Sequence, residues 1–295
     1  MKIIFIIMTA ITFCIKGLAM GADYTLTPTG SESGAHLYEL TPNNSSRKAV
    51  KRFFVVGDDL PSPRRIVYIF HGYKPAHDPY KQDPSYFIAY WDLSRMSEKY
   101  QTVFVLPDND DSVYPIDTAG DPSSDLAMCV EIEKHTRKIF PSASKPLVIG
   151  FSAGVEGAIK FAHLSGISET IAISGNYDLL SLPENEKRFH ARIFGESPER
   201  WKKENPLLIL QDGNPLTLYL LCEEKNQINV KQAARLMREK ISSVTIVDLR
   251  FLGKGFSHDW TFLSSDGVRS AIETIISGNK EEILLLTKGR TGTEK

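Results

Sequence analysis

The chain has 295 residues and a formal net charge of −1, from 35 lysines and arginines against 36 aspartates and glutamates. A near-neutral chain without a long basic run is not expected to bind nucleic acid. The length allows one large α/β domain or two small ones. Because strand and helix patterns alternate without a polar linker, we expect a single domain.

The first 22 residues have the pattern of an export signal. Lys2 precedes an apolar run over residues 3–15, and the small residues Ala19 and Gly21 offer a signal-peptidase site. The run is too short to span a bilayer comfortably, which favours a cleaved signal over an uncleaved anchor. We therefore expect a secreted or periplasmic protein whose folded domain begins at residue 23 and which keeps no membrane span after cleavage.

A continuous apolar run over residues 66–70 predicts a strand that is covered on both faces. The run stops at His71-Gly72-Tyr73. A glycine at the end of such a strand lets backbone N–H groups approach a substrate carbonyl oxygen. The N–H groups of Gly72 and Tyr73 are therefore candidates for one half of an oxyanion hole.

Residues 148–154 end in a G-x-S-x-G turn, and a helix-forming stretch follows them. A strand, a sharp turn and a helix in this order place Ser152 at the tip of the turn, with its hydroxyl pointing out of the fold. The turn also brings the next backbone N–H, that of Ala153, to where it can meet a developing oxyanion. The pattern alone is loose, but the strand before it and the helix after it supply the context that it requires. Ser152 is the candidate nucleophile.

The rest of the chain continues to alternate between strand and helix patterns. These patterns cover residues 216–222, 230–241, 243–250 and 268–276. A glycine-rich loop over residues 253–260 follows the last predicted strand and carries one histidine, His258, which is the candidate general base. Residues 279–295 are polar, and we expect a disordered tail there.

Together these segments resemble the esterase D / S-formylglutathione hydrolase-like family of α/β-hydrolases. The residues that carry the resemblance are His71-Gly72, the turn at residues 150–154 and the ending His258-Asp259-Trp260, with weaker support from residues 194–206. The order of oxyanion loop, serine and histidine is that of the α/β-hydrolases. The resemblance implies an α/β-hydrolase domain over residues 23–278, with a mostly parallel central sheet and helices on both faces. Its active site would lie at the carboxyl ends of the strands.

The acid that completes a catalytic triad belongs in the loop after the strand at residues 216–222. Family members typically show Gly-x-x-Asp there, and the matching residues of this chain are Glu223-Glu224-Lys225-Asn226. The resemblance thus places Asn226 where an aspartate is expected. An asparagine oxygen can accept a hydrogen bond from the histidine Nδ1–H, but it supplies no full negative charge to stabilise an imidazolium.

Three carboxylates are alternatives as partners of the histidine. Glu224 lies two residues before Asn226 and has a longer side chain, and Asp178 follows the preceding strand pattern. Asp259 ranks lowest because the side chains of sequence neighbours usually diverge. We rank Asn226 first by position, then Glu224, then Asp178.

These features indicate a secreted serine carboxylesterase that forms an acyl-enzyme at Ser152 and acts on a small-molecule or polysaccharide-linked ester. The asparagine at the acid position predicts a slow enzyme. Two alternatives remain: an acyltransferase that uses the same site, and a catalytically weakened α/β-hydrolase fold kept as a binding protein. We expect no cofactor and no metal, since His77 lacks further ligands at metal-binding spacing.

Overall fold

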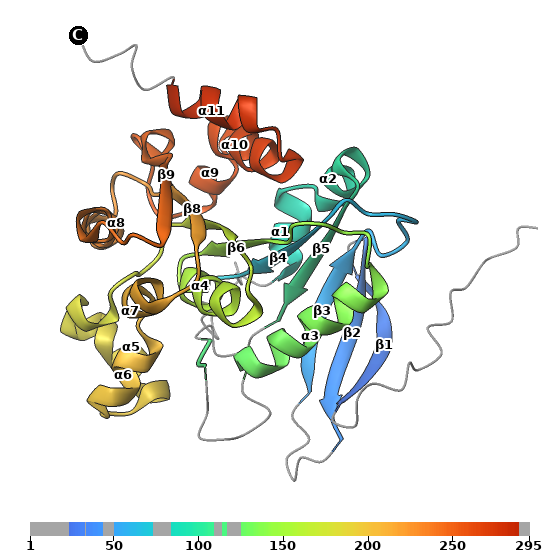
Figure 1. The fold of residues 1–295 in the computed structure, drawn as a ribbon, viewed down its shortest axis with the longest axis horizontal. Helices are drawn as coiled ribbons and strands as arrows, with labels where there is room; N and C mark the ends of the chain where they lie inside the picture. The colour runs from blue at the N-terminus through green and yellow to red at the C-terminus, as the bar shows by residue number, and fades with distance from the viewer. Residues whose placement is uncertain are drawn as a thin grey trace, which may run out of the picture.

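The computed structural model describes residues 24–32, 34–43, 50–72, 84–108, 114–116 and 125–288. In these residues nine strands form one sheet, in the order β1-β2-β3-β5-β4-β6-β7-β8-β9 (Figure 1). The strands are β1 (Tyr24–Glu32), β2 (Ala35–Pro42), β3 (Lys51–Val56), β4 (Arg65–Phe70), β5 (Thr102–Pro107), β6 (Leu147–Phe151), β7 (Glu169–Ile173), β8 (Leu216–Leu221) and β9 (Val244–Asp248).

The sheet has an antiparallel part and a longer parallel part. Strands β1, β2 and β3 pair antiparallel, and β3 pairs antiparallel with β5. From β5 through β4, β6, β7 and β8 to β9, every pairing is parallel. All six residues of β4 and of β5 are buried, as expected of strands covered on both faces. The predicted mostly parallel α/β architecture is confirmed.

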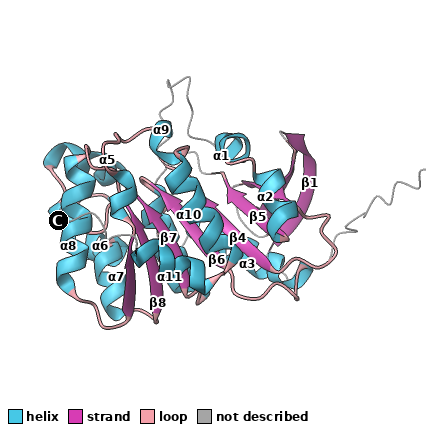
Figure 2. Cartoon of the chain, turned by 90° about the horizontal axis from the view of Figure 1, so that it is seen from above, coloured by secondary structure: helices cyan, strands magenta, loops and turns pink. Residues whose placement is uncertain are grey.

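Helices cover both faces of the sheet (Figure 2). Those on one face are α3 (Asp125–Ile139), α4 (Gly154–Ser165), α7 (Pro206–Asp212) and α8 (Gln227–Glu239). Those on the other face are α1 (Pro84–Tyr90), α2 (Leu93–Tyr100), α9 (Trp260–Leu263), α10 (Asp266–Ser277) and α11 (Lys280–Lys288). Between β7 and β8, the 3-10 turn η1 (Leu179–Ser181) and helices α5 (Glu184–Phe194) and α6 (Pro198–Glu204) form a small separate core. A second 3-10 turn, η2 (Arg250–Gly253), follows β9.

The C-terminal region differs from the tail that the sequence predicts. Helix α11 occupies residues 280–288, and its Ile283 packs on the same core as α10. The sequence pattern did not predict this helix, because polar residues surround its short apolar run and Ile283 is only partly buried. Residues 289–295, and the export signal expected in residues 1–22, lie outside the described residues. Within the described part, none of the helices has the length and apolar character needed to cross a membrane.

Candidate active site

The G-x-S-x-G turn forms a strained corner between β6 and α4. Ser152 has φ = 55°, in the left-handed region that residues other than glycine rarely adopt. Its N–H donates to the Ile173 carbonyl oxygen of the neighbouring strand β7 at 2.9 Å, so the corner is tied to the sheet. Helix α4 begins two residues later, at Gly154. Ser152 therefore stands at the carboxyl end of β6, in the conformation typical of a nucleophile elbow.

The two glycines of the motif are needed for close backbone approach. A Cβ built on Gly154 would lie 2.2 Å from the Phe70 carbonyl oxygen, and one on Gly150 would lie 2.6 Å from the Gly154 carbonyl oxygen. Both distances are too short for real atoms. Because neither glycine has a positive φ, the conformational strain falls on Ser152 alone. The glycines let α4 press its first turn against the end of β4.

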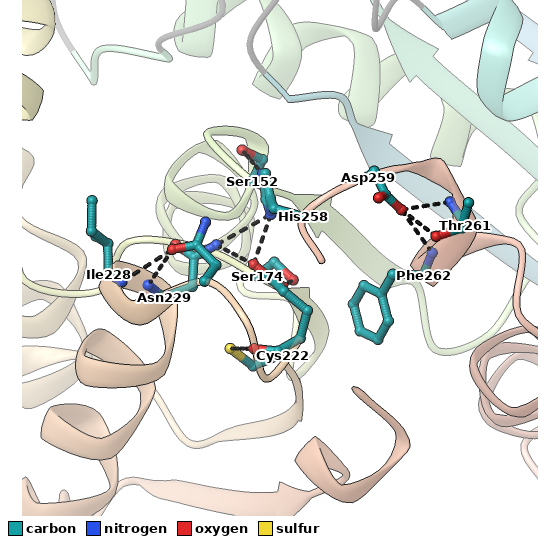
Figure 3. Close-up of polar contacts among 11 residues, drawn as sticks. Ser152, Ser174, Cys222, Ile228, Asn229, His258, Asp259, Thr261 and Phe262 are labelled. Atoms are coloured by element: carbon teal, nitrogen blue, oxygen red, sulfur yellow. Dashed lines mark hydrogen bonds and ion pairs between the residues drawn. The ribbon is translucent and has the colours of Figure 1, made fainter. Parts of the chain in front are cut away.

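His258 lies between Ser152 and a buried carboxylate (Figure 3). Its Nε2 is 3.0 Å from Ser152 Oγ, and its Nδ1 is 2.9 Å from Glu223 Oε1. The ring of Phe151 stacks on the imidazole, with centroids 5.1 Å apart. The His258 side chain keeps 25% of its surface exposed, whereas Glu223 is fully buried. A serine, a histidine and a carboxylate are thus linked in series, with the histidine reachable from solvent.

Three hydrogen bonds favour the charged form of the buried Glu223 carboxylate. Besides the bond to His258, Oε2 accepts from the Ser174 hydroxyl, and Oε1 accepts from Asn229 Nδ2 at 2.8 Å. Burial alone would raise the pKa of Glu223, but the bonds with His258, Ser174 and Asn229 together lower it below its usual value. An ionised carboxylate at Nδ1 favours the tautomer whose Nε2 is free to accept a proton from Ser152.

Asn226 does not take the position expected of it. Its Oδ1 accepts from the backbone N–H groups of Ile228 at 3.0 Å and Asn229 at 3.2 Å, so it caps the N-terminus of α8. Asparagine is a favoured residue for this cap. The residue that meets His258 is Glu223, only two positions after β8 ends. The spacing typical of the family placed the acid three residues too late in the loop. Choosing the first carboxylate after the strand would have identified Glu223.

The other ranked carboxylates also have partners away from His258. Glu224 accepts from the Gly255 backbone N–H at 2.8 Å. Asp178 pairs with Arg235, whose Nε is 2.7 Å from Oδ2. Asp259 caps the short helix α9 by accepting from the Thr261 N–H at 2.9 Å, and its side chain diverges from that of His258 (Figure 3). Each of these carboxylates has a structural task in the loop that it occupies.

The candidate oxyanion groups lie at the start of α4 and the end of β4. Within the described residues, the Ala153 N–H donates no backbone hydrogen bond, and it sits at a helix N-terminus, where the dipole favours negative charge. The Gly72 carbonyl oxygen accepts from Nδ1 of the buried His71 at 2.8 Å, which holds this segment in place. A Cβ on Gly154 would lie 2.4 Å from the His71 carbonyl oxygen, so the two groups belong to adjoining backbone. Tyr73 lies outside the described residues.

The sequence predicts no metal site at His77. His77 lies outside the described residues. In the segments that are described, histidine, cysteine, aspartate and glutamate side chains do not gather in any group of three or more that could hold a metal ion.

Esterases and related hydrolases are among the solved structures with a similar fold. An S-formylglutathione hydrolase from Agrobacterium tumefaciens superposes with a TM-score of 0.59 and is 14% identical, covering 89% of this chain and 98% of that chain. FphF, a fluorophosphonate-binding serine hydrolase of Staphylococcus aureus, has a TM-score of 0.54 and 19% identity, covering 90% and 99%. EstE1, a carboxylesterase cloned from a metagenomic library, has a TM-score of 0.53 and 15% identity, covering 91% and 92%.

These neighbours establish the fold of the chain. No protein-family model matches the sequence, and no curated protein does either. At identities below 20%, the structural likeness shows a shared architecture, which is that of the α/β-hydrolases. The S-formylglutathione hydrolases and carboxylesterases among the neighbours agree with the family that the sequence motifs resemble.

Proposed function

We propose that this α/β-hydrolase-fold protein is a serine hydrolase that cleaves carboxylic esters through Ser152, His258 and Glu223. The observation that carries the proposal is the series of contacts from Ser152 Oγ through the imidazole to the buried carboxylate. A nucleophile within reach of a base, which is itself oriented by a third group, is what acyl transfer by a serine requires.

In the first half of the reaction, Ser152 is acylated. Glu223 accepts the Nδ1–H of His258, so Nε2 can take the proton of Ser152 as Oγ attacks the ester carbonyl carbon. The N–H of Ala153 and one from the Gly72–Tyr73 segment stabilise the oxyanion of the tetrahedral intermediate. The imidazolium then protonates the alcohol oxygen as the C–O bond breaks, and the alcohol leaves.

In the second half, water regenerates the enzyme. His258 Nε2 takes a proton from a water molecule, which attacks the carbonyl carbon of the acyl-serine, and the same oxyanion groups stabilise the second intermediate. The bond to Ser152 Oγ breaks, Oγ recovers its proton from the imidazolium, and a carboxylic acid is released. If an alcohol takes the place of water, the same steps give acyl transfer.

A carboxylate at His258 Nδ1 supports a fully active enzyme over the weakened one expected from the sequence. That expectation, and the binding-protein alternative with it, rested on an uncharged residue beside His258. Because Asn226 caps α8 and a charged carboxylate stands at Nδ1, we expect turnover in the ordinary range of esterases. The substrate would be a small-molecule or polysaccharide-linked ester, met outside the cytoplasm after removal of residues 1–22. Mass measurement of the exported protein tests that removal.

The test combines a covalent probe with hydrolysis assays. A fluorophosphonate should label the wild type at Ser152, and a panel of p-nitrophenyl esters should be hydrolysed, whereas Ser152→Ala should show neither. Adding an acceptor alcohol and separating the products distinguishes hydrolysis from acyl transfer. A folded wild type that is neither labelled nor active would refute the proposal and would favour the binding-protein alternative.

A further inference from the structure

Ser174 contacts the carboxylate that orients His258, although it takes no part in the proposed chemistry. Its hydroxyl donates to Glu223 Oε2, while the other oxygen, Oε1, faces His258 Nδ1. Ser174 is itself 1% exposed, so water does not compete for this bond. The two oxygens of one carboxylate are therefore held from opposite sides, and the rotation of the carboxylate is fixed.

The backbone of Ser174 repeats the conformation of the nucleophile on the next strand. Ser174 has φ = 57° and follows β7, just as Ser152 with φ = 55° follows β6. The Ser152 N–H donates to the Ile173 carbonyl oxygen of β7, and the Ser174 N–H donates to the Leu221 carbonyl oxygen of β8, each at 2.9 Å. Each serine thus turns out of its own strand and is tied to the end of the next one.

A left-handed serine carries strain that a glycine would avoid. Such a conformation is strained in a residue other than glycine and tends to persist at functional sites. Glycine adopts this φ without penalty, but it has no hydroxyl. Ser174 has this strained backbone, and its hydroxyl binds the Glu223 carboxylate.

The electrostatics of Glu223 give that hydroxyl a specific effect. Glu223 is fully buried, and its pKa is held down against burial by the bonds from His258, Ser174 and Asn229. Without Ser174, Glu223 Oε2 loses the hydrogen bond from the Ser174 hydroxyl, and a buried acceptor left without a donor is costly. The carboxylate would then be easier to protonate and freer to turn its Oε1 away from His258.

We infer that Ser174 is a positioning residue of the active site, whose hydroxyl fixes the orientation of the Glu223 carboxylate, with Asn229 as the second donor. The inference rests on the proposed function, because it assigns Ser174 an effect on the base that activates Ser152. Its action passes through Glu223 and His258 and needs no contact with substrate.

The experiment uses two variants that lack the hydroxyl but differ in backbone strain. Ser174→Ala keeps a Cβ at the left-handed φ, and Ser174→Gly relieves the strain. The values of kcat and KM for one p-nitrophenyl ester are measured from about pH 5 to pH 9, a range that spans the ordinary histidine pKa. Both variants should lose about ten-fold in kcat, the effect of one hydrogen bond to a charged group, with KM changed by less than about two-fold.

The pH profile separates positioning from mere stability. Losing a donor raises the pKa of Glu223, so a proton binds to the Glu223–His258 pair at higher pH. The acidic limb of kcat/KM should therefore move to higher pH in both variants. In a Glu223→Gln background, the loss caused by Ser174→Ala should shrink to less than about two-fold, because the carboxylate that the hydroxyl orients is gone.

Ser97→Ala is the matched control. Ser97 is a buried serine of α2 for whose hydroxyl no hydrogen-bond partner is found in the described residues, so the substitution removes the same atom away from the site. It should leave kcat and the acidic limb unchanged.

The outcomes separate this inference from the proposed function. Unchanged kcat and an unchanged limb in a folded Ser174→Gly would overturn the inference, and so would a fall in melting temperature without either effect. Fluorophosphonate labelling of the wild type would still support the function. If Ser174→Ala does not fold, Ser174→Gly decides alone. A wild type without labelling or hydrolysis would overturn both.

Discussion

Among the described residues, two histidines each pair closely with a glutamate. The two histidines differ in the group that the other ring nitrogen contacts. His258 Nδ1 lies 2.9 Å from Glu223, and His190 Nε2 lies 2.9 Å from Glu156 on α4. The remaining nitrogen of His258 faces the Ser152 hydroxyl, which can give up a proton to it. The remaining nitrogen of His190 is 3.1 Å from the Glu186 carbonyl oxygen, which can only accept.

This difference makes one pair a candidate for catalysis and the other a buried ion pair. With an acceptor at each nitrogen, His190 must carry both protons. Burial would lower the pKa of His190, but the charge and hydrogen bond of Glu156 raise it above its ordinary value. The side chains of His190 and Glu156 are 2% and 0% exposed. The same two residue types thus build a proton acceptor at the sheet edge and a fixed cation between α4 and α5.

The largest expected effect comes from removing the imidazole at the sheet edge. His258→Ala should lower kcat by about ten-thousand-fold or more, as removal of a base that acts with its nucleophile does. Its melting temperature should stay near that of the wild type, because the side chain is partly exposed. Steady-state hydrolysis measures the fall in kcat, and thermal unfolding measures the melting temperature. Retained turnover would mean that another group serves as base.

Neutralising the acid comes next, and the loop offers a matched pair of adjacent glutamates. Glu223→Gln keeps the shape but removes the charge beside His258, and kcat should fall by about a thousand-fold. Glu224→Gln alters the neighbour that binds the Gly255 N–H, and turnover should change by less than about two-fold. Equal losses in the two variants would contradict the assignment of Glu223.

The second pair should respond in stability. His190→Leu removes the histidine that pairs with the buried Glu156 carboxylate, which should lower the free energy of unfolding by about 3–5 kcal/mol. Turnover per folded molecule should stay close to that of the wild type. Denaturant titration measures the free energy of unfolding, and active-site labelling counts the folded molecules to which turnover is normalised. The double variant with Glu156→Gln should regain part of the loss, and a failure to regain any would show that the pairing is not what His190 contributes.

The stability that this pair provides should depend on pH in one direction. Because the folded pKa of His190 is raised, its contribution is fully present below the pKa of an unfolded histidine and is lost as pH rises through the folded value. The melting temperature of the wild type should therefore fall on the alkaline side more than that of the His190→Leu, Glu156→Gln double variant. Parallel curves would show that His190 is not the titrating group.

The smallest effect is expected at Asn226. Asn226→Ala removes the cap of α8 and should destabilise the protein by about 1 kcal/mol. Turnover of the folded protein should be unchanged, since among the described residues the Asn226 side chain bonds only to backbone N–H groups at the start of the helix. Chemical denaturation and a hydrolysis assay suffice, and a large fall in kcat at full stability would restore Asn226 as a partner of His258.

The sequence predicted the architecture and the elements that carry Ser152 and His258, because those depend on local patterns. Apolar runs mark the buried strands, and G-x-S-x-G has few local solutions between a strand and a helix. Glu223 was not predicted, because its contact with His258 depends on where β8 ends and on the direction in which the loop then turns. Ser174 was not predicted, because nothing local reveals that a serine takes a positive φ.

The buried pair of His190 and Glu156 was beyond sequence reasoning for another reason. The two residues are 34 positions apart, in helices whose relative placement only the packed fold determines. In an amphipathic pattern, charged residues such as these indicate a solvated face. In the folded chain these two residues are instead buried against each other. A contact between two helices leaves no periodic pattern in the sequence of either one.

The groups of the site come from the ends of separate parallel strands, and this affects how the protein reaches its native state. Ser152 and His258 are 106 residues apart in the chain, and the strands that bring them together are joined by helical crossovers. Contacts of such long range form late, because the entropy of closing a large loop must be overcome first. Helices can therefore be restored during refolding before the serine and the imidazole meet. Reactivity toward a serine probe is then a stricter measure of complete folding than helix content.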